Sequence, residues 1–361
     1  MEAKDTKEII ECAVLVGISF GGKDNINFSI AELVRLAETA GVEVRGILLQ
    51  NAKEVTPATY IGSGKLEELK DLIALKQANL VIFNNELSGS QQKNLCEFLD
   101  TKVIDRTTLI LDIFAKRALS VEGKLQVELA QAKYFLPRIS GMSGTSGRFG
   151  SGGVGMRGPG ETKLELDKRV VQKNIQKLQK EILGLKEKRT LRRKQRALSN
   201  VKNVSIVGYT NAGKSTLINL ITKADIYADD RLFATLDTTS RKLWIDVNKE
   251  IVLTDTVGFI DKLPHTFVDA FASTLEEAVD SDLILHVIDV ADKDIEIHRT
   301  TVLNVLNSVG AKDIPILTVY NKIDKLNKPF AIGFNEVVIS TKDNKGIENL
   351  KSKMVEMLWN E

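Results

Sequence analysis

The most constraining feature of the sequence is an eight-residue loop between a strand-like run and a helix-like run. The apolar residues 204–207 before it predict a short buried strand, and residues 216–222 after it predict a helix. Glycines let backbone N–H groups face an anion, and the N-terminus of the following helix favours negative charge. The loop has the GxxxxGK[ST] pattern that binds nucleotide phosphates in this strand–loop–helix context, and it reads Gly208-Tyr209-Thr210-Asn211-Ala212-Gly213-Lys214-Ser215. We therefore predict that Lys214 reaches the β- and γ-phosphates and that the Ser215 hydroxyl ligates Mg²⁺.

A second motif ends the apolar run 251–254 and reads Asp255-Thr256-Val257-Gly258. In the DxxG pattern the aspartate supports the Mg²⁺ shell, and the glycine amide can meet the γ-phosphate. The run 283–290 predicts another buried strand, and the run 316–320 a third.

A third motif, Asn321-Lys322-Ile323-Asp324, ends that last run and predicts the base specificity. The Asp324 carboxylate can accept hydrogen bonds from N1–H and the 2-amino group of guanine, while the Lys322 stem lies along the ring. The residues Ser340-Thr341-Lys342 end the next strand and are placed to present a backbone amide to O6. Because the motifs occur together and in order, they favour a guanine-nucleotide site over a chance match.

The first hundred residues alternate apolar runs with helical patterns. Runs 13–20, 42–50, 80–83 and 102–104 predict strands, and residues 29–40, 66–76 and 90–99 predict helices between them. We expect a parallel α/β domain over residues 1–106. The stretch Gly62-Ser63-Gly64-Lys65 lacks the phosphate-loop spacing and predicts a tight turn before a helix.

Residues 107–200 predict an antiparallel helical hairpin. Apolar residues recur at helical spacing from Ile110 to Leu136, which predicts one long helix, and the pattern resumes from Leu164 to Leu185. The connector 140–160 holds nine of the 25 glycines and no acidic residue, so it cannot form a core of its own. An inert linker is the alternative interpretation of this connector.

Positive charge is concentrated in one segment. Residues 133–200 carry a net charge of +12, and the remainder of the chain carries −10. This distribution is typical of contact with a polyanion, with a merely solvated helix face as the alternative. The basic residues of the second helix are Lys173, Lys177, Lys180, Lys186, Lys188, Arg189, Arg192, Arg193, Lys194 and Arg196.

The chain resembles the HflX-type GTPases. The residues that carry the resemblance are the GYTNAGKS loop, DTVGF, NKID, the stretch Tyr60 to Lys65, Arg157-Gly158-Pro159-Gly160-Glu161-Thr162, and Phe233-Ala234-Thr235-Leu236-Asp237. The resemblance implies an N-terminal α/β domain, a helical hairpin and a C-terminal P-loop GTPase domain over residues 201–361. It also implies binding of the large ribosomal subunit and its RNA, with a role in ribosome dissociation or rescue under stress. The sequence runs about twenty residues past Lys342, enough for the last helix of the GTPase domain, whereas many relatives carry a further C-terminal domain.

The resemblance implies that Thr235 joins the Mg²⁺ and the γ-phosphate, although Thr238 and Thr239 are equally eligible from the residues alone. The expected catalytic residues are then Lys214, Thr235 and Gly258, and the expected metal ligands Ser215, Thr235 and Asp255. Asn211 resembles the asparagine of potassium-stimulated relatives, which makes K⁺ a further candidate cation. The expected nucleotide contacts are residues 208–216 including Thr216, 233–237, 255–258, 321–324 and 340–342.

The position that holds a water-orienting glutamine in many GTPases is Phe259 here, so hydrolysis by the isolated protein should be slow. Phe259 is either a packing residue in a mobile segment or a side chain that retracts on activation. Among the three histidines, His286 lies in a predicted buried strand, and His265 and His298 have polar neighbours and no evident partner.

Other function classes fit less well. A signalling or membrane-directed GTP switch acting on a protein effector is the main alternative, but a protein effector does not need +12 in one segment. An ATP-driven nucleic-acid remodeller is opposed by Asp324. With no apolar run near the ~18 residues of a membrane span and no apolar leader at Met1, we expect a cytoplasmic monomer without membrane insertion. A location at the membrane surface stays open, since an acidic membrane also attracts basic helices.

Overall fold

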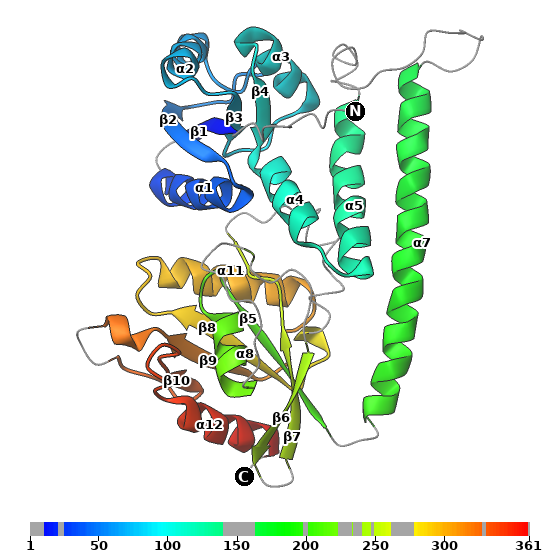
Figure 1. Ribbon diagram of the computed structural model, residues 1–361, viewed down its shortest axis with the longest axis vertical. Coiled ribbons are helices and arrows are strands. Elements are labelled where there is room, and N and C mark those ends of the chain that lie inside the picture. The colour runs from blue at the N-terminus through cyan, green and yellow to red at the C-terminus, as the bar shows by residue number, and fades with distance from the viewer. Residues whose placement is uncertain are drawn as a thin grey trace, which may run out of the picture. The chain divides into compact units, whose positions relative to one another are not determined.

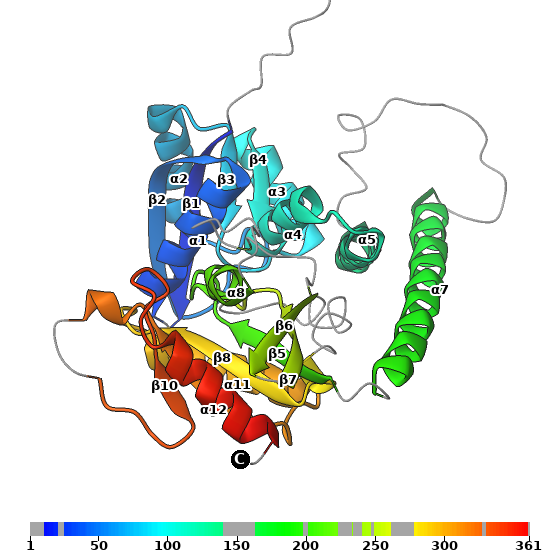
Figure 2. The same ribbon diagram turned by 60° about the horizontal axis from the view of Figure 1, so that its bottom comes forward.

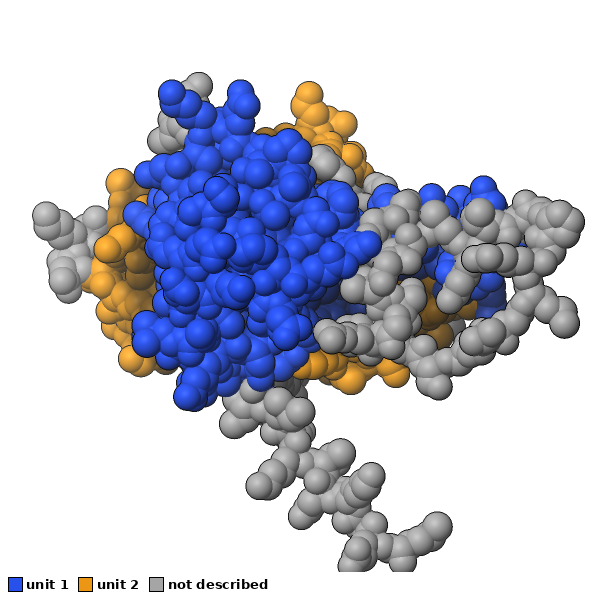
Figure 3. Space-filling model, turned by 90° about the horizontal axis from the view of Figure 1, so that it is seen from above, with its two compact units in different colours: residues 1–113, 131–177 blue, residues 114–130, 178–361 orange. Residues whose placement is uncertain are grey.

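The computed structural model describes residues 11–20, 25–139, 163–197, 201–222, 233, 240–246, 249–260, 278–326 and 330–359 (Figure 1). These residues pack as two compact units, drawn in blue and orange in Figure 3. The first unit comprises residues 1–113 and 131–177, and the second comprises residues 114–130 and 178–361. The three-domain division at residues 106 and 200 stays a prediction.

The first unit contains a four-stranded parallel sheet in the order β2-β1-β3-β4. Its strands are β1 (Cys12–Phe20), β2 (Glu43–Ala52), β3 (Leu80–Phe83) and β4 (Lys102–Asp105), and its helices are α1 (Ile26–Ala40), α2 (Ser63–Lys76) and α3 (Gly89–Leu99). Parallel strands need helical crossovers, which explains the alternation along the sequence. The predicted α/β fold is confirmed, and Gly62 precedes α2 as the predicted turn.

The predicted single helix from Ile110 to Leu136 is wrong. The structure has two helices, α4 (Arg106–Arg117) and α5 (Val121–Phe135), followed by the short 3-10 helix η1 (Leu136–Arg138). Ser120 begins the second helix, because its hydroxyl accepts a hydrogen bond from the Gly123 amide at 2.8 Å. A serine at this place satisfies an N–H group that has no partner within the helix.

The second helix of the predicted hairpin is α7 (Lys163–Ala197), which is 35 residues long. Its described side chains follow the predicted apolar stripe: Leu178 is buried, whereas Val170 and Leu183, which lie off the stripe, are exposed. The connector 140–160 lies outside the described residues, as do the side chains of residues 188–197.

The second unit contains a six-stranded sheet in the order β10-β9-β8-β5-β7-β6, in which only the pairing of β6 with β7 is antiparallel (Figure 2). The strands are β5 (Lys202–Gly208), β6 (Ser240–Asp246), β7 (Lys249–Asp255), β8 (Leu283–Asp289), β9 (Ile316–Asn321) and β10 (Glu336–Val338). The helical segments are α8 (Lys214–Thr222), α11 (Ile295–Ser308), η2 (Ile323–Lys325) and α12 (Ile347–Trp359).

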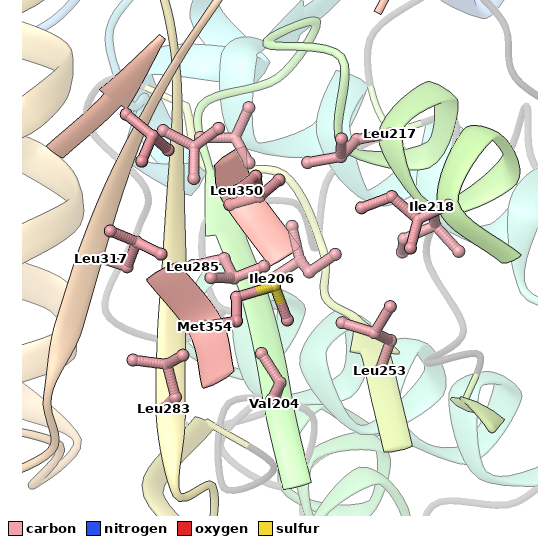
Figure 4. Close-up of a cluster of buried hydrophobic side chains, with 14 of the residues drawn as sticks. Val204, Ile206, Leu217, Ile218, Leu253, Leu283, Leu285, Leu317, Leu350 and Met354 are labelled. Carbon is pink, nitrogen blue, oxygen red and sulfur yellow. The ribbon is translucent and has the colours of Figure 1, made fainter. Parts of the chain in front are cut away.

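The main core of this unit lies between the sheet and helices α8 and α12 (Figure 4). Leu285 of β8, Leu317 of β9 and Met354 of α12 are among its fully buried members. The alternation of strand side chains sends His286 and Ile288 to the opposite face. Among the described residues, no helix combines the length and the apolar character needed to cross a membrane.

The packing of α12 predicts a specific cost for truncating one methionine. Met354→Ala removes a fully buried side chain and should lower the free energy of unfolding of the second unit by about 2–5 kcal/mol. Met357→Ala, on the same helix but only partly buried, is the matched control and should cost about 1 kcal/mol or less. Urea unfolding followed by tryptophan fluorescence reports on this unit, because Trp244 and Trp359 both belong to it. Equal destabilisation by the two variants would contradict the packing.

Candidate nucleotide-binding site

The phosphate loop connects β5 to α8 and holds an unusual backbone. Asn211 and Gly213 have positive φ values of 62° and 93°, which glycine tolerates best and asparagine better than most residues. A Cβ atom on Gly213 would lie 2.3 Å from Nδ2 of Asn321, so this position has no room for a side chain. The backbone conformation of the loop therefore depends on the residue types at positions 211 and 213, where few other residues would fit.

Lys214 is buried at the first turn of α8. Its ammonium donates hydrogen bonds to the carbonyls of Gly208 at 3.0 Å and Tyr209 at 2.9 Å, so it lies over the phosphate loop. Burial lowers the pKa of Lys214 from 10.5 to about 8, and the carboxylate of Asp255 partly offsets this effect. A buried ammonium whose described hydrogen-bond partners are neutral carbonyls favours an incoming anion such as a phosphate.

Ser215 and Asp255 lie together at the edge of the loop. The Ser215 hydroxyl donates to Oδ2 of Asp255 at 3.0 Å, and the strand pairing of β5 with β7 puts Asp255 beside Ile206. Thr256 donates to the Ile206 carbonyl at 2.7 Å and fixes the start of the DxxG segment. A hydroxyl and a carboxylate are the oxygen ligands that Mg²⁺ takes from proteins beside nucleotide phosphates, so the two residues fit that ion.

The end of the DxxG segment lies against the phosphate loop. A Cβ atom on Gly258 would come within 2.8 Å of the Thr210 side chain and 3.0 Å of the Lys214 ammonium. The amide of Phe259 donates to the Gly208 carbonyl at 3.1 Å, and the amide of Thr210 donates to the Phe259 carbonyl at 2.8 Å. The Phe259 side chain is buried, as the packing interpretation predicts. Its movement on activation stays a hypothesis.

The base-reading loop is joined to the phosphate loop through Asn321. Its buried amide donates to the Ala212 carbonyl at 2.9 Å and accepts from the Thr341 amide at 3.1 Å. Lys322 donates to the Asn211 carbonyl at 2.8 Å and pairs with Asp289 at 2.7 Å. Both contacts cross between segments far apart in sequence, so hydrogen bonds within the protein join the two loops.

Asp324 is oriented by Ser340. The Ser340 hydroxyl donates to Oδ1 of Asp324 at 2.7 Å and accepts from the Asp343 amide at 3.0 Å. The Ser340 hydrogen bond is the main reason that the pKa of Asp324 is lowered, so its carboxylate is charged at neutral pH. The predicted residues of the phosphate loop, the DxxG segment, the NKxD segment and the 340–342 segment thus meet at one edge of the sheet.

The predicted segment 233–237 is described only at Phe233. This residue is buried, has φ of 56°, and packs edge-to-face on Phe114 with ring centroids 4.5 Å apart. Both residues belong to the second unit. Ala234, Thr235, Leu236 and Asp237, together with the alternatives Thr238 and Thr239, lie outside the described residues.

One residue beside the site was misjudged from sequence. His298 of α11 was expected to have no partner, but its ring stacks on Tyr209 of the phosphate loop with centroids 3.6 Å apart and planes 14° apart. Its Nδ1 lies 3.5 Å from Asp292. His286 is buried as expected, and His265 lies outside the described residues. The spacing of a histidine and a tyrosine 89 residues apart carries no signal that could have revealed this stack.

Comparison with known proteins agrees with this geometry. Three family models match the chain: "GTP-binding GTPase N-terminal" over residues 27–115, "GTP-binding GTPase Middle Region" over 117–196 and "50S ribosome-binding GTPase" over 203–322. A GTPase HflX of Caldanaerobacter subterraneus is 50% identical over 97% of this chain and 81% of its own length. That of Escherichia coli is 42% identical over 97% of this chain and 84% of its own length.

A solved structure is also similar over nearly the whole chain. It is a GTP-binding protein from the archaeon Sulfolobus solfataricus in complex with GDP, with 26% identity and a TM-score of 0.51 over 97% of this chain and 99% of that chain. These relatives and the site geometry together establish binding of GTP and GDP and hydrolysis of GTP.

The orientation of Asp324 predicts base specificity. Asp324→Asn replaces one of the two acceptor oxygens by a donor, so guanine should lose one hydrogen bond and gain a donor–donor repulsion, and GTP affinity should fall roughly 100-fold. Xanthine has an acceptor at C2, so XTP should bind the variant more tightly than GTP. Competition of GTP and XTP against a fluorescent guanine nucleotide measures both, with Asp343→Asn as the matched control. A variant that still prefers GTP would refute the assignment of Asp324 as the base reader.

The burial of Lys214 predicts proton uptake on nucleotide binding. With a pKa of about 8, roughly half of the Lys214 side chains are neutral at pH 8, and bound phosphates favour the charged form. Binding of GDP should therefore take up about 0.5 proton at pH 8 through this residue. Isothermal titration in buffers of different ionisation enthalpy measures it, and Lys214→Arg, which is always protonated, is the control. Identical uptake by wild type and variant would contradict the lowered pKa.

Proposed function

This chain belongs to the HflX family of GTPases, and from that premise we propose that it binds the large ribosomal subunit and its RNA. We further propose that it couples GTP binding and hydrolysis to ribosome dissociation or rescue under stress. The observation that carries the proposal is the concentration of +12 charges in residues 133–200. Ribosomal RNA is the dense polyanion in the cytoplasm that such a segment fits best.

Helix α7 supplies a long basic surface for that contact. A helix of 35 residues extends about 50 Å. Lys173, Lys177 and Lys180 fall on one side of it because they are spaced by four and three residues, and all three are exposed. The description of the GTPase family model, "50S ribosome-binding GTPase", supports the same partner.

The described residues of the nucleotide site include no side chain placed to orient the attacking water. Lys214 and the Gly258 amide can neutralise and hold the γ-phosphate, but Phe259 offers no hydrogen bond that could orient the attacking water. Ser215, Asp255 and Thr235 would hold Mg²⁺, which neutralises the phosphate charge that develops during transfer. A partner that contributes a group beside residue 259 would then supply what the described residues lack.

The packing of Phe233 offers a route from nucleotide to helices. Phe233 lies two residues before Thr235, and its ring is held by Phe114 at the end of α4. When Thr235 joins the γ-phosphate and Mg²⁺, the backbone at Phe233 has to follow. Since the Phe233 ring packs on Phe114, binding of the γ-phosphate would change the packing at the end of α4.

The proposal predicts that ribosome binding depends on α7. Replacing Lys173, Lys177 and Lys180 by glutamine should weaken binding of the GTP form to large subunits by at least tenfold. It should also flatten the dependence of log affinity on log salt by roughly 0.7–0.9 for each RNA phosphate that the variant no longer neutralises. Sedimentation with purified subunits, using a non-hydrolysable GTP analogue and GDP, measures both.

The control variant removes three lysines elsewhere, Lys53, Lys70 and Lys76, and should bind as wild type does. Equal weakening by the two triple variants would mean that only net charge matters. Binding of acidic lipid vesicles in preference to subunits would instead favour the membrane-directed alternative.

A second prediction concerns the monovalent cation. The Asn211 side chain is exposed beside the phosphate loop, so its oxygen can help place K⁺ near the phosphates. Hydrolysis should then be roughly tenfold faster in K⁺ than in Na⁺ at matched ionic strength, and Asn211→Ala should remove the difference. Steady-state GTP hydrolysis in the two salts measures it. Equal turnover of wild type in K⁺ and Na⁺ would refute this role of Asn211.

A further inference from the structure

The second face of the nucleotide-binding sheet carries an unexpected polar row. His286 of β8 pairs in register with Thr318 of β9, and Thr318 pairs with Glu336 of β10. Residues paired in register across parallel strands point to the same face. The opposite face at these strands is a continuous apolar core. A histidine and a threonine on inner strands and a glutamate on the edge strand β10 are therefore not there to pack a core.

Few described residues cover this polar row. Parallel strands are usually joined by a helix that packs on the sheet. The connection from β9 to β10 contains, in its described part, only the three-residue η2. Helix α11 and residues 333–335 border the row instead, and they leave a pocket of about 300 Å³. That volume is at the lower end of small-molecule sites.

The pocket offers hydrogen-bond donors that the described protein does not use. Arg299 of α11 lines it, and no described residue accepts a hydrogen bond from its guanidinium. Within the same set of residues, the side chains of His286 and Thr318 have no hydrogen-bond partner either, although His286 is only 1% exposed. The pocket therefore presents polar side chains whose hydrogen-bonding capacity the described residues leave unused.

The one acidic side chain of the pocket is already engaged. Glu336 accepts from the Gly333 amide at 2.6 Å and from the Tyr320 hydroxyl at 3.3 Å. Burial, Arg299 and Lys214 lower the pKa of His286 to about 3, so the ring is neutral and keeps one N–H donor and one acceptor. The hydrogen-bonding groups of the pocket that remain unused are thus mainly donors, and they surround the positive charge of Arg299.

Three apolar side chains, together with Gly333 and Asn335, form the remaining walls. Leu303 of α11 and Ile316 of β9 line the pocket, and so does Phe334, which is 82% exposed. An exposed aromatic ring and a half-buried arginine can together bind an organic ligand: the ring packs on the planar part of the ligand, and the arginine pairs with its charged group.

We propose that this pocket binds a small organic anion, whose carboxylate or phosphate group pairs with Arg299 and whose apolar body packs against Leu303, Ile316 and Phe334. His286 and Thr318 complete the site as hydrogen-bond donors to the anionic group. The ligand is distinct from the nucleotide, because the pocket opens on the face of the sheet that α11 borders and contains no residue of the phosphate or base-reading loops.

The site would also be adjacent to the catalytic machinery. Arg299 directly follows His298, the residue that stacks on Tyr209 of the phosphate loop. Anion binding at Arg299 therefore acts on the same turn of α11 that contacts the nucleotide site.

The test uses the full chain with Mg²⁺ and GDP bound, so that the phosphate loop is blocked, and ¹⁵N-labelled histidine. The chain has three histidines, and His286→Phe identifies the signal of His286. Benzoate and phenyl phosphate are titrated, with neutral benzamide as the isosteric control. We expect saturable shifts of the His286 signal with dissociation constants of roughly millimolar for ligands of this size, and none with benzamide.

Three variants make the result specific. Arg299→Met should weaken anion binding at least tenfold, because it removes the charged donor. Leu303→Trp should also weaken it by filling the pocket while leaving Arg299 in place. Arg241→Met, which removes an exposed arginine on β6, should bind as wild type does. Retention of GDP by each variant reports that the second unit is folded.

Saturation by only one of the two anions supports the proposal and identifies the preferred group. The absence of saturable binding to wild type overturns it. So does binding that is as strong in Arg299→Met, or as strong with benzamide, since the site would then not recognise negative charge.

Discussion

The nucleotide site depends on one buried side-chain amide, that of Asn321. Its nitrogen donates to the carbonyl of Ala212 in the phosphate loop, and its oxygen accepts from the amide of Thr341 in the last loop of the site. Gly213 leaves the space that this amide occupies. Because Asp324 follows three residues later, the same side chain that closes the phosphate loop also sets the distance between the phosphates and the base.

The charges around this frame suit the binding of a nucleotide. The buried ammonium of Lys214 donates to backbone carbonyls and can donate to phosphate oxygens. The hydrogen bond from Ser340 favours the charged form of the Asp324 carboxylate. The DxxG segment is bound to the phosphate loop through Phe259, whose backbone pairs and whose ring is buried. The arrangement is thus complete for recognition, whereas the water has no described side chain to orient it. The proposed ribosomal partner would act at this gap.

Much of the site was predictable because each motif follows a buried strand, and parallel strands of one sheet end at one edge. The repeating pattern of strands and helices predicted the first sheet for the same reason. The break before α5 was missed because helical periodicity continues through Ser120, and the capping bond that starts a new helix leaves only a serine as its signal. The stack of His298 on Tyr209 and the pocket beside Arg299 were missed because both arise from tertiary packing of α11, which periodicity does not encode.

The central claim is that Asn321 joins the phosphate and base-reading loops and so shapes the nucleotide site. Asn321→Asp keeps the size of the side chain and the acceptor for Thr341, but it places an oxygen against the carbonyl oxygen of Ala212. The direct measurement is the dissociation constant of a fluorescent GDP for wild type and this variant. The account predicts affinity at least tenfold weaker, from the loss of a buried hydrogen bond and the repulsion that replaces it. Unchanged GDP affinity in a folded Asn321→Asp protein would contradict it.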